Sequence, residues 1–160
     1  MLDAAAALPE ARFVFVGDGP RLAWVQEQVA ARALANISFL PFQPEAKLAE
    51  SLSAADLHLV TMEPHLSGLV VPSKVYGVMA AGRPCLFLGP ADSEAARLLQ
   101  DHDAGSVVEG DLAATIRAWL SDTDRRHEAG ARARAAAEAW GPTNAAEKFD
   151  TVLRQAIGQR

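Results

Sequence analysis

Short apolar runs that alternate with helix-forming segments are the feature that most limits what this chain can fold into. The runs lie at Arg12–Gly17, Ile37–Leu40, Asp56–Val60, Cys85–Leu88 and Gly105–Val108. Runs of this length, without polar alternation, are typical of strands buried on both faces of a parallel sheet. Strands separated by helices form βαβ units, which cross over on the faces of such a sheet. The sequence therefore predicts an α/β fold, with a mostly parallel sheet covered by helices in three layers.

The segments between these runs carry the helix signals. We expect helices from Pro20 to about Leu34, from Pro44 with Leu48 and Leu52 facing inward, from Pro72 to Ala81, and from a cap at Asp92 or Ser93 to about Gln100. Helices usually have proline in the first turn and glycine just past the last turn, and Pro72 and Gly82 follow this preference. Beyond residue 111 the pattern is helical over about 112–120, 122–140 and 143–157. With 160 residues, we expect a single domain over 1–160, with a helical tail at about 122–158.

Composition excludes several classes of function. The net charge of -5 argues against a nucleic-acid-binding surface, which would be basic. No apolar run approaches the roughly 18 residues that span a bilayer, and Met1–Leu8 lacks the basic start of a signal peptide. A single cysteine, Cys85, allows no internal disulfide and no cysteine-rich zinc site. The histidines show no metal-site spacing either, so we expect a cytoplasmic protein without a bound metal.

The segment Val71-Pro-Ser-Lys74 is the strongest candidate for a binding site, because it follows a strand and opens a helix. Ligands of parallel α/β sheets bind at the carboxyl ends of the strands. A helix N-terminus offers free N–H groups to an anion, and Ser73 and Lys74 add a hydroxyl and a cation. This combination could hold a diphosphate. Pro-Ser-Lys can equally well begin an ordinary surface helix, and spacing alone favours that interpretation.

Other loops at the same sheet edge carry weaker signals. Gly17 and Gly19 allow a tight turn and a close backbone approach, although Leu22 replaces the third glycine of a dinucleotide fingerprint. Phe42 and Gln43 follow the second strand, where a base could lie, but packing of Phe42 into the interior is the favoured alternative. The next loop contains further polar candidates for contacts with sugar hydroxyls, namely Glu63, His65 and Ser67, and solvent exposure explains them equally well.

Several of these segments, taken in order and spacing, resemble the C-terminal domain of family 4 retaining glycosyltransferases. They are Phe13–Pro20, Asn36–Phe42, Leu52–Val60, Val71–Lys74 and Met79–Pro84. The resemblance covers residues 1 to about 110 and is closest to the branch that builds capsule, colanic-acid-like or O-antigen polysaccharides. It implies the C-terminal, Rossmann-like half of a GT-B fold, which binds a nucleotide diphosphate sugar, usually a UDP-sugar. It also implies transfer to a glycan or lipid-linked acceptor without a metal or other cofactor.

By position, the resemblance assigns roles to individual residues. Ser73 and Lys74 would contact the donor diphosphate. Residues in the nucleotide-binding loops and in the helix after Lys74 would border the nucleotide, namely Gly17, Gly19, Phe42, Gln43 and Tyr76. Glu63, His65 and Gly68 would border the sugar. No catalytic residue is assigned. Leu69 and Gly77 occupy the positions of two glutamates that many family members carry, so the ribose contacts must come from elsewhere.

The beginning of the chain is the second departure from the family pattern. Met1–Leu8 looks like the helix that follows the family's first strand, and in the strand order 3-2-1-4-5-6 that first strand is central. We therefore expect a sheet without its middle strand, filled by rearrangement or by a partner chain, and a separate acceptor domain or partner. Such a chain would be inactive alone, and it could reach the inner face of the membrane only through that other half. A non-catalytic nucleotide-binding or assembly module and a GT-B sugar-nucleotide 2-epimerase remain as alternatives.

Overall fold

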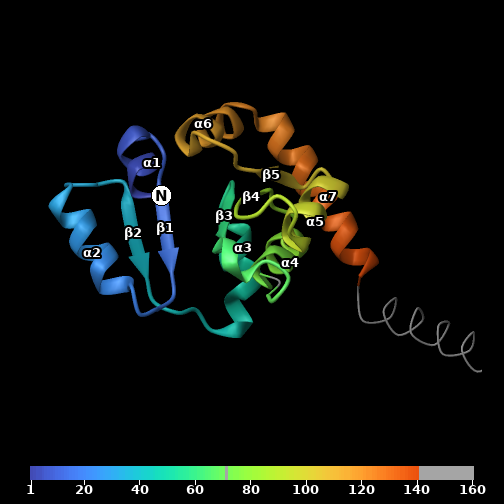
Figure 1. The fold of residues 1–160 in the computed structure, drawn as a ribbon, viewed down its shortest axis with the longest axis horizontal. Coiled ribbons are helices and arrows are strands. Elements are labelled where there is room, and N and C mark those ends of the chain that lie inside the picture. Colours follow the sequence, from blue (N-terminus) through green and yellow to red (C-terminus); the bar gives the residue numbers. More distant parts are fainter. Residues whose placement is uncertain (71, 141–160) are drawn as a thin grey trace, which may run out of the picture.

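The fold is α/β, as predicted, in a computed structural model that describes residues 1–70 and 72–140 (Figure 1). The strands in these residues are β1 (Phe13–Val16), β2 (Ile37–Leu40), β3 (His58–Thr61), β4 (Cys85–Leu88) and β5 (Gly105–Val107). The α-helices are α1 (Leu2–Ala7), α2 (Leu22–Ala31), α3 (Leu48–Ser53), α4 (Lys74–Ala80), α5 (Glu94–Asp101), α6 (Leu112–Ser121) and α7 (Thr123–Ala139). Two short 3-10 helices, η1 (Glu45–Lys47) and η2 (Pro64–Leu66), precede α3 and follow β3.

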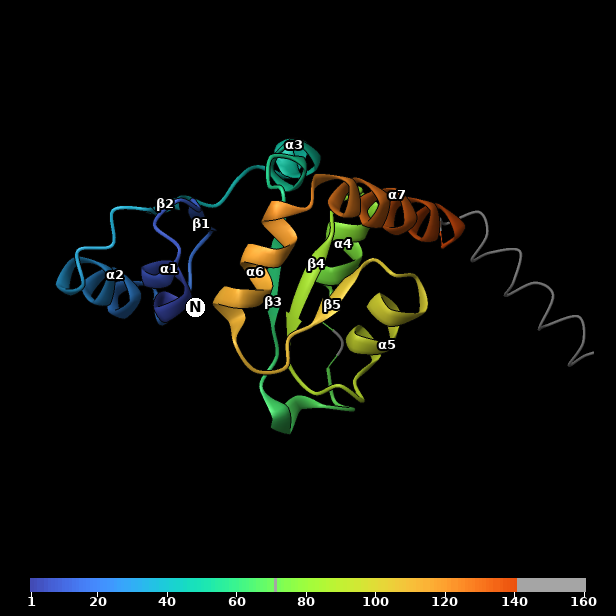
Figure 2. The same cartoon turned by 90° about the horizontal axis from the view of Figure 1, so that it is seen from above.

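All strand pairs are parallel, but the strands form two sheets instead of one. β1 pairs with β2, with Phe13 opposite Ile37, while β4 lies between β3 and β5, with Cys85 opposite His58 and Gly105. Figures 1 and 2 both show the order β2-β1-β3-β4-β5, with β1 and β3 as neighbours that are not paired. The break lies where the sequence predicts a missing central strand. The described residues do not fill it by rearrangement.

Most of the core lies on the three-stranded sheet. One cluster joins β3 and β4 to α4, α5 and α7, and its largest fully buried side chains include Phe87, Met79 and Leu99. A second cluster lies under α1 and α6 and includes Leu8, Leu86, Ile116 and Trp119, with Phe13 and Leu59 packed against it. By contrast, α2 has no buried residue, and Val14, Val16 and Leu40 of the two-stranded sheet are about half exposed. The β1–β2 sheet is therefore only partly covered by other elements of the described structure.

Helix α1 links the two parts of the structure. The side-chain amide of Asn36 donates hydrogen bonds to the carbonyl oxygens of Ala5, Leu8 and Ala11 at 2.9–3.0 Å, which ties the end of α1 to the start of β2. On the other side, the Arg117 guanidinium of α6 donates to the Ala7 carbonyl at 2.9 Å. This packing holds the β1–β2 sheet beside the larger sheet.

Several details of the sequence prediction need correction. Helix α2 begins at Leu22, and α4 begins at Lys74, because the preceding residues form turns and the N-cap. Leu48 is 52% exposed and does not face inward, whereas Leu52 does pack against the core. Of the two predicted caps of α5, Ser93 is the one used, since its hydroxyl accepts from the Ala96 N–H. The helix expected over 143–157 lies outside the described residues.

Helix α7 crosses the end of α4 at a contact between two glycines. Gly82, just past α4, has φ +67°, the left-handed conformation that its place in the sequence predicts. A Cβ built at Gly130 of α7 would stand 2.4 Å from the Gly82 carbonyl oxygen, so only glycine fits at this crossing. This contact fixes α4, whose other end carries Ser73 and Lys74.

Candidate functional site

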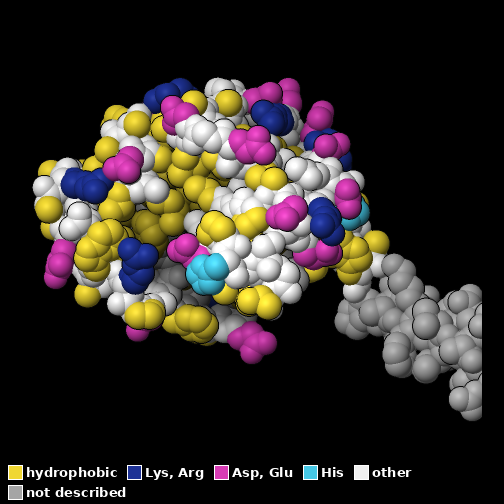
Figure 3. Space-filling model, viewed as in Figure 1, with side chains coloured by type: hydrophobic (Ala, Val, Ile, Leu, Met, Phe, Trp, Pro, Cys, Tyr) yellow, Lys and Arg dark blue, Asp and Glu magenta, His cyan; other side chains and the backbone are white. Residues whose placement is uncertain are grey.

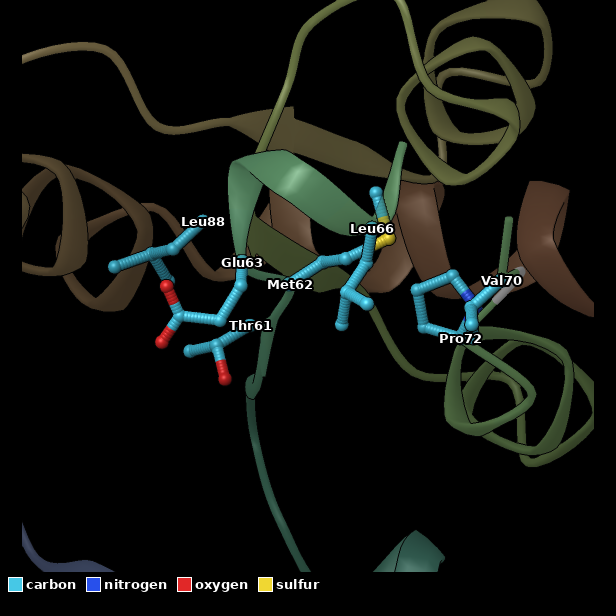
Figure 4. Close-up of a pocket in the computed structure, with 7 residues that line it drawn as sticks. All are labelled: Thr61, Met62, Glu63, Leu66, Val70, Pro72 and Leu88. Carbon is cyan, nitrogen blue, oxygen red and sulfur yellow. The ribbon is translucent and has the colours of Figure 1, made fainter. Parts of the chain in front are cut away.

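A pocket of about 380 Å³ opens at the carboxyl ends of β3 and β4, where a parallel sheet binds its ligands (Figure 4). It is lined by Thr61, Met62, Glu63, Leu66, Val70, Pro72 and Leu88. In Figure 4 the polar ends of Thr61 and Glu63 lie together on one side, while Val70 and Pro72 lie on the other. The size is within the range of small-molecule sites, which run from roughly 300 to 1,000 Å³.

The pocket wall forms because the chain turns sharply after β3. Met62 continues the strand by donating its N–H to the Leu88 carbonyl at 2.9 Å, and its side chain is buried in the core. Glu63 then caps η2, with Pro64 in the first turn, and Leu66 points back toward the sheet. Gly68 has φ +76°, which reverses the chain before Val70. The polar loop predicted to meet the sugar thus supplies Glu63 to the lining.

Ser73 and Lys74 follow Pro72 directly in the chain; Pro72 lines the pocket, and Ser73 and Lys74 are not among its lining residues. Both side chains are exposed, while the next residue, Val75, is fully buried and anchors the helix start. Within residues 1–70 and 72–140, the Lys74 ammonium has no ion-pair or hydrogen-bond partner. A free cation beside a pocket is available to a negatively charged ligand.

Gly17 and Phe42 lie together at the ends of β1 and β2, apart from the pocket lining. A Cβ at Gly17, which has φ +110°, would stand 3.8 Å from the Phe42 ring. Phe42 is 82% exposed, so the favoured prediction that it packs inward is wrong. Gln43 donates to the Pro41 carbonyl at 2.8 Å, and the Gly19 N–H donates to Asp18 Oδ1 at 2.7 Å. These residues belong to the two-stranded sheet.

The remaining predicted residues lie elsewhere. Tyr76 is 39% exposed, and its ring meets the edge of the Trp140 ring at 5.7 Å between centroids, on the side of α4 that faces α7. His65 is exposed on η2 and does not line the pocket. The structure thus groups Glu63 with the start of α4, and Gly17 with Phe42.

Few titratable groups near the sheets are perturbed. Burial raises the pKa of the Cys85 thiol to about 12, which makes it an inert core residue. Burial also lowers the pKa of His58, whose Nε2 lies 2.8 Å from the Leu52 carbonyl oxygen, with Arg83 adding to the decrease. No cluster of acidic, histidine or cysteine side chains in the described part of the chain could hold a metal ion. Neither perturbed group lines the pocket.

The apolar lining is what sequence reasoning missed. In the sequence these side chains look like core or loop residues, and the residues predicted to bind are their polar neighbours; the apolar lining residues are Met62, Leu66, Val70 and Leu88. The rule that ligands bind at strand carboxyl ends predicts the loops after β3 and β4. It does not predict which apolar side chains in those loops stay uncovered.

Comparison with known proteins decides the family. Residues 1–136 match the family described as glycosyl transferases group 1. The chain belongs to this family. WbjE of Pseudomonas aeruginosa, named a probable glycosyltransferase, is 33% identical over 96 residues, which are 60% of this chain and 24% of that protein. WcaI of Escherichia coli (strain K12), named a putative colanic acid biosynthesis glycosyl transferase, is 30% identical over 88 residues, which are 55% of this chain and 22% of WcaI.

A solved structure agrees with this architecture. Sucrose-phosphate synthase from Thermosynechococcus elongatus superimposes with a TM-score of 0.72 at 20% identity, over 98% of this chain and 42% of that one. The fold is therefore a Rossmann-like part of a GT-B glycosyltransferase. The chain spans about a quarter of the length of the curated relatives that it matches. No helix in residues 1–70 and 72–140 is long and apolar enough to cross a membrane.

Proposed function

We propose that this chain is the donor-binding part of a retaining, family 4 hexosyltransferase that takes its sugar from a nucleotide diphosphate sugar, with UDP as the nucleotide. The sugar would pass to a glycan or lipid-linked acceptor during synthesis of a cell-surface polysaccharide, on the cytoplasmic side of the membrane. Family membership and the position of the pocket support this assignment. The observation that carries it is the free cation of Lys74 beside a pocket at the strand ends.

The pocket suits the sugar and the diphosphate of such a donor. Glu63 offers a hydrogen-bond acceptor and Thr61 a hydroxyl to the hydroxyl groups of a sugar, and Leu66 and Val70 line the pocket with apolar groups. The Lys74 ammonium would offset the charge that develops on the diphosphate as the bond to the sugar breaks. We propose that this cation, together with main-chain N–H groups at Ser73, replaces a metal ion and any other cofactor.

The nucleotide would extend from the pocket toward Gly17 and Phe42. The exposed Phe42 ring offers a flat apolar surface to a base, and the turn at Gly17 and Gly19 leaves room for a close approach. We propose that a second domain or a partner chain supplies the acceptor site, so that these residues alone bind the donor without transferring its sugar. A donor-binding module without transferase activity is the second candidate, since the pocket lies entirely within residues 61–88.

Titration of the chain with UDP and UDP-glucose, followed by calorimetry, tests the donor site. A charge-assisted hydrogen bond contributes about 1.5 to 3 kcal/mol, so Lys74→Ala should weaken UDP binding by roughly 10- to 100-fold. Lys47→Ala is the matched control, because Lys47 is an exposed lysine on η1 that does not line this pocket. Equal affinities of the two variants would remove Lys74 from the site.

Two further outcomes separate the alternatives. Addition of EDTA should leave UDP affinity unchanged if Lys74 and main-chain groups are sufficient, and a loss of binding would contradict the metal-free site. Sugar transfer to a glycan acceptor by this chain alone would refute the need for another domain or partner. If no nucleotide binds at all, the donor-site proposal fails.

A further inference from the structure

Helix α7 runs along α4 in the opposite direction, and successive contacts fix the alignment of the two helices (Figure 2). The contact between two glycines lies just past the last turn of α4. Further along α7, the Arg134 guanidinium donates to the Ala80 carbonyl at 2.8 Å. At the end of α7, the Trp140 ring meets the Tyr76 ring at 5.7 Å between centroids, with 72° between the ring planes. Of these contacts, the aromatic one lies nearest to Lys74 along α4.

The Trp140 ring is itself held by its other neighbours. It packs against the core cluster that joins β3 and β4 to α4, α5 and α7. The ring of His102, which follows the last turn of α5, meets it edge to face at 5.3 Å between centroids. Aromatic rings favour such edge-to-face arrangements at roughly 4.5 to 7 Å. Trp140 therefore forms a support that joins the ends of α5 and α7 to one side of α4.

The geometry of α4 places Tyr76 and Lys74 on opposite flanks of the helix. Successive residues of an α-helix are about 100° apart around its axis, so these two residues are about 200° apart. Val75 lies between them and is fully buried in the core. On the outer side, a Cβ at Gly77 would stand 3.4 Å from a side chain of α3. The flank with Tyr76 rests on Trp140, while Lys74 is exposed on the other flank and accessible to a ligand.

The charge of the chain makes the position of an individual cation important for an anionic ligand. The net charge is -5, and Figure 3 shows basic and acidic side chains interspersed, without a broad basic patch on that face. A broad positive field would attract an anion from a distance. Charge-assisted hydrogen bonds form at about 2.7 to 2.9 Å. The affinity for a diphosphate should therefore depend on where the Lys74 ammonium lies.

We propose that Trp140 is a positioning residue for the donor site, which touches no ligand and acts through Tyr76 on the orientation of Lys74. Without the indole ring, the first turn of α4 would tilt toward the space that the ring leaves beside α7. Lys74, on the opposite flank, would then move away from the diphosphate. This inference rests on the proposed function, because it requires a diphosphate bound at Lys74.

Calorimetry with UDP on the wild-type chain, Trp140→Ala, Lys74→Ala and the double variant tests this role. Lys74→Ala alone should weaken binding by roughly 10- to 100-fold. We expect Trp140→Ala to lose about half of that binding free energy, which is a roughly 3- to 10-fold weaker affinity. The same change should weaken binding less than about twofold where Lys74 is already alanine, because the two residues act as one unit. Equal losses on both backgrounds, or no loss on either, would overturn the proposal.

Further variants separate the ring contact from general packing. Trp140→Phe keeps an aromatic ring against Tyr76 and should bind UDP within about twofold of the wild type. Trp140→Leu keeps apolar contact with the core but has no ring, so it should match Trp140→Ala, and it replaces that variant in the comparison if the alanine variant does not fold. Arg134→Ala is the matched control, because it removes only the hydrogen bond to the Ala80 carbonyl at the other end of α4. A loss of UDP affinity as large in Arg134→Ala as in Trp140→Ala would contradict the role of Trp140.

The same measurements distinguish failure of this inference from failure of the proposed function. If the wild-type chain binds no UDP, the donor-site proposal fails, and the role of Trp140 fails with it. If UDP binds and Lys74→Ala weakens it, but Trp140→Ala weakens it equally with and without Lys74, the donor site stands. In that case only the positioning role of Trp140 is wrong.

Discussion

Replacement of Gly130 by alanine sets two opposite effects against each other, and the structure predicts which one is larger. Gly130 lies inside the 17-residue helix α7. In an exposed helix, glycine to alanine stabilises by roughly 0.5 to 1 kcal/mol, since glycine loses more backbone entropy on folding. Here the added Cβ would stand 2.4 Å from the Gly82 carbonyl oxygen and 3.2 Å from its carbon. The contact is with backbone, so no side chain can rotate away.

The carbonyl of Gly82 cannot move easily either. The turn that carries it is fixed by hydrogen bonds from the Gly82 N–H to Met79 and from the Arg83 N–H to Val78. Helix α7 must therefore shift by more than half an ångström away from α4, judged from the roughly 3 Å at which a Cβ can meet an oxygen. Overpacking of this kind costs about 1 to 3 kcal/mol. The net expectation for Gly130→Ala is a loss of about 1 to 2 kcal/mol.

Thermal unfolding followed by circular dichroism measures the effect. For a chain of this size, 1 kcal/mol shifts the midpoint by about 2 to 4 °C, so Gly130→Ala should lower it by roughly 2 to 8 °C. Ala131→Gly is the control at an exposed neighbouring position, where only the backbone entropy of glycine acts. It should lower the midpoint by a few degrees. If Gly130→Ala raises the midpoint, the close approach of α7 to Gly82 is wrong.

Two further predictions concern stability. Asn36→Ala removes the hydrogen bonds that the Asn36 amide donates to three carbonyl oxygens at 2.9–3.0 Å. It should lower the free energy of unfolding, measured in urea, by about 2 to 3 kcal/mol. The control Ser38→Ala changes an exposed side chain on β2 and should lower it by less than about 0.5 kcal/mol. Burial lowers the pKa of His58 from its ordinary 6.5. As the pH falls, His58 of the unfolded chain therefore binds a proton before His58 of the folded chain does. The free energy of unfolding should stay constant above pH 6.5 and decrease as the pH drops below it. His58→Gln should remove part of this pH dependence.

The strands could be predicted from the sequence because their signal is local. Each of the five runs forms a strand, and β2 and β4 have the predicted ends. Pro72 and Gly82 bracket α4 as expected, since proline and glycine act through their own backbone angles. The break between β1 and β3 could be predicted from the resemblance to a family whose central strand comes first. These features depend on short segments or on their order.

Features that depend on distant neighbours could not be predicted in this way. Phe42 is apolar and follows a strand, yet it is exposed because the two-stranded sheet has little to cover it. Leu48 has helical spacing with Leu52, but only Leu52 reaches the core. The fit of Gly130 against Gly82 joins residues on different helices. The pocket combines residues from three segments, and its apolar wall has no pattern in any one of them.

The candidate site is divided between two sheets, and this division has a consequence for ligand binding. The pocket belongs to the three-stranded sheet with its large core, whereas Gly17 and Phe42 belong to the sheet attached through α1. A ligand that contacts both parts must hold them at one distance, and doing so costs free energy if they move independently.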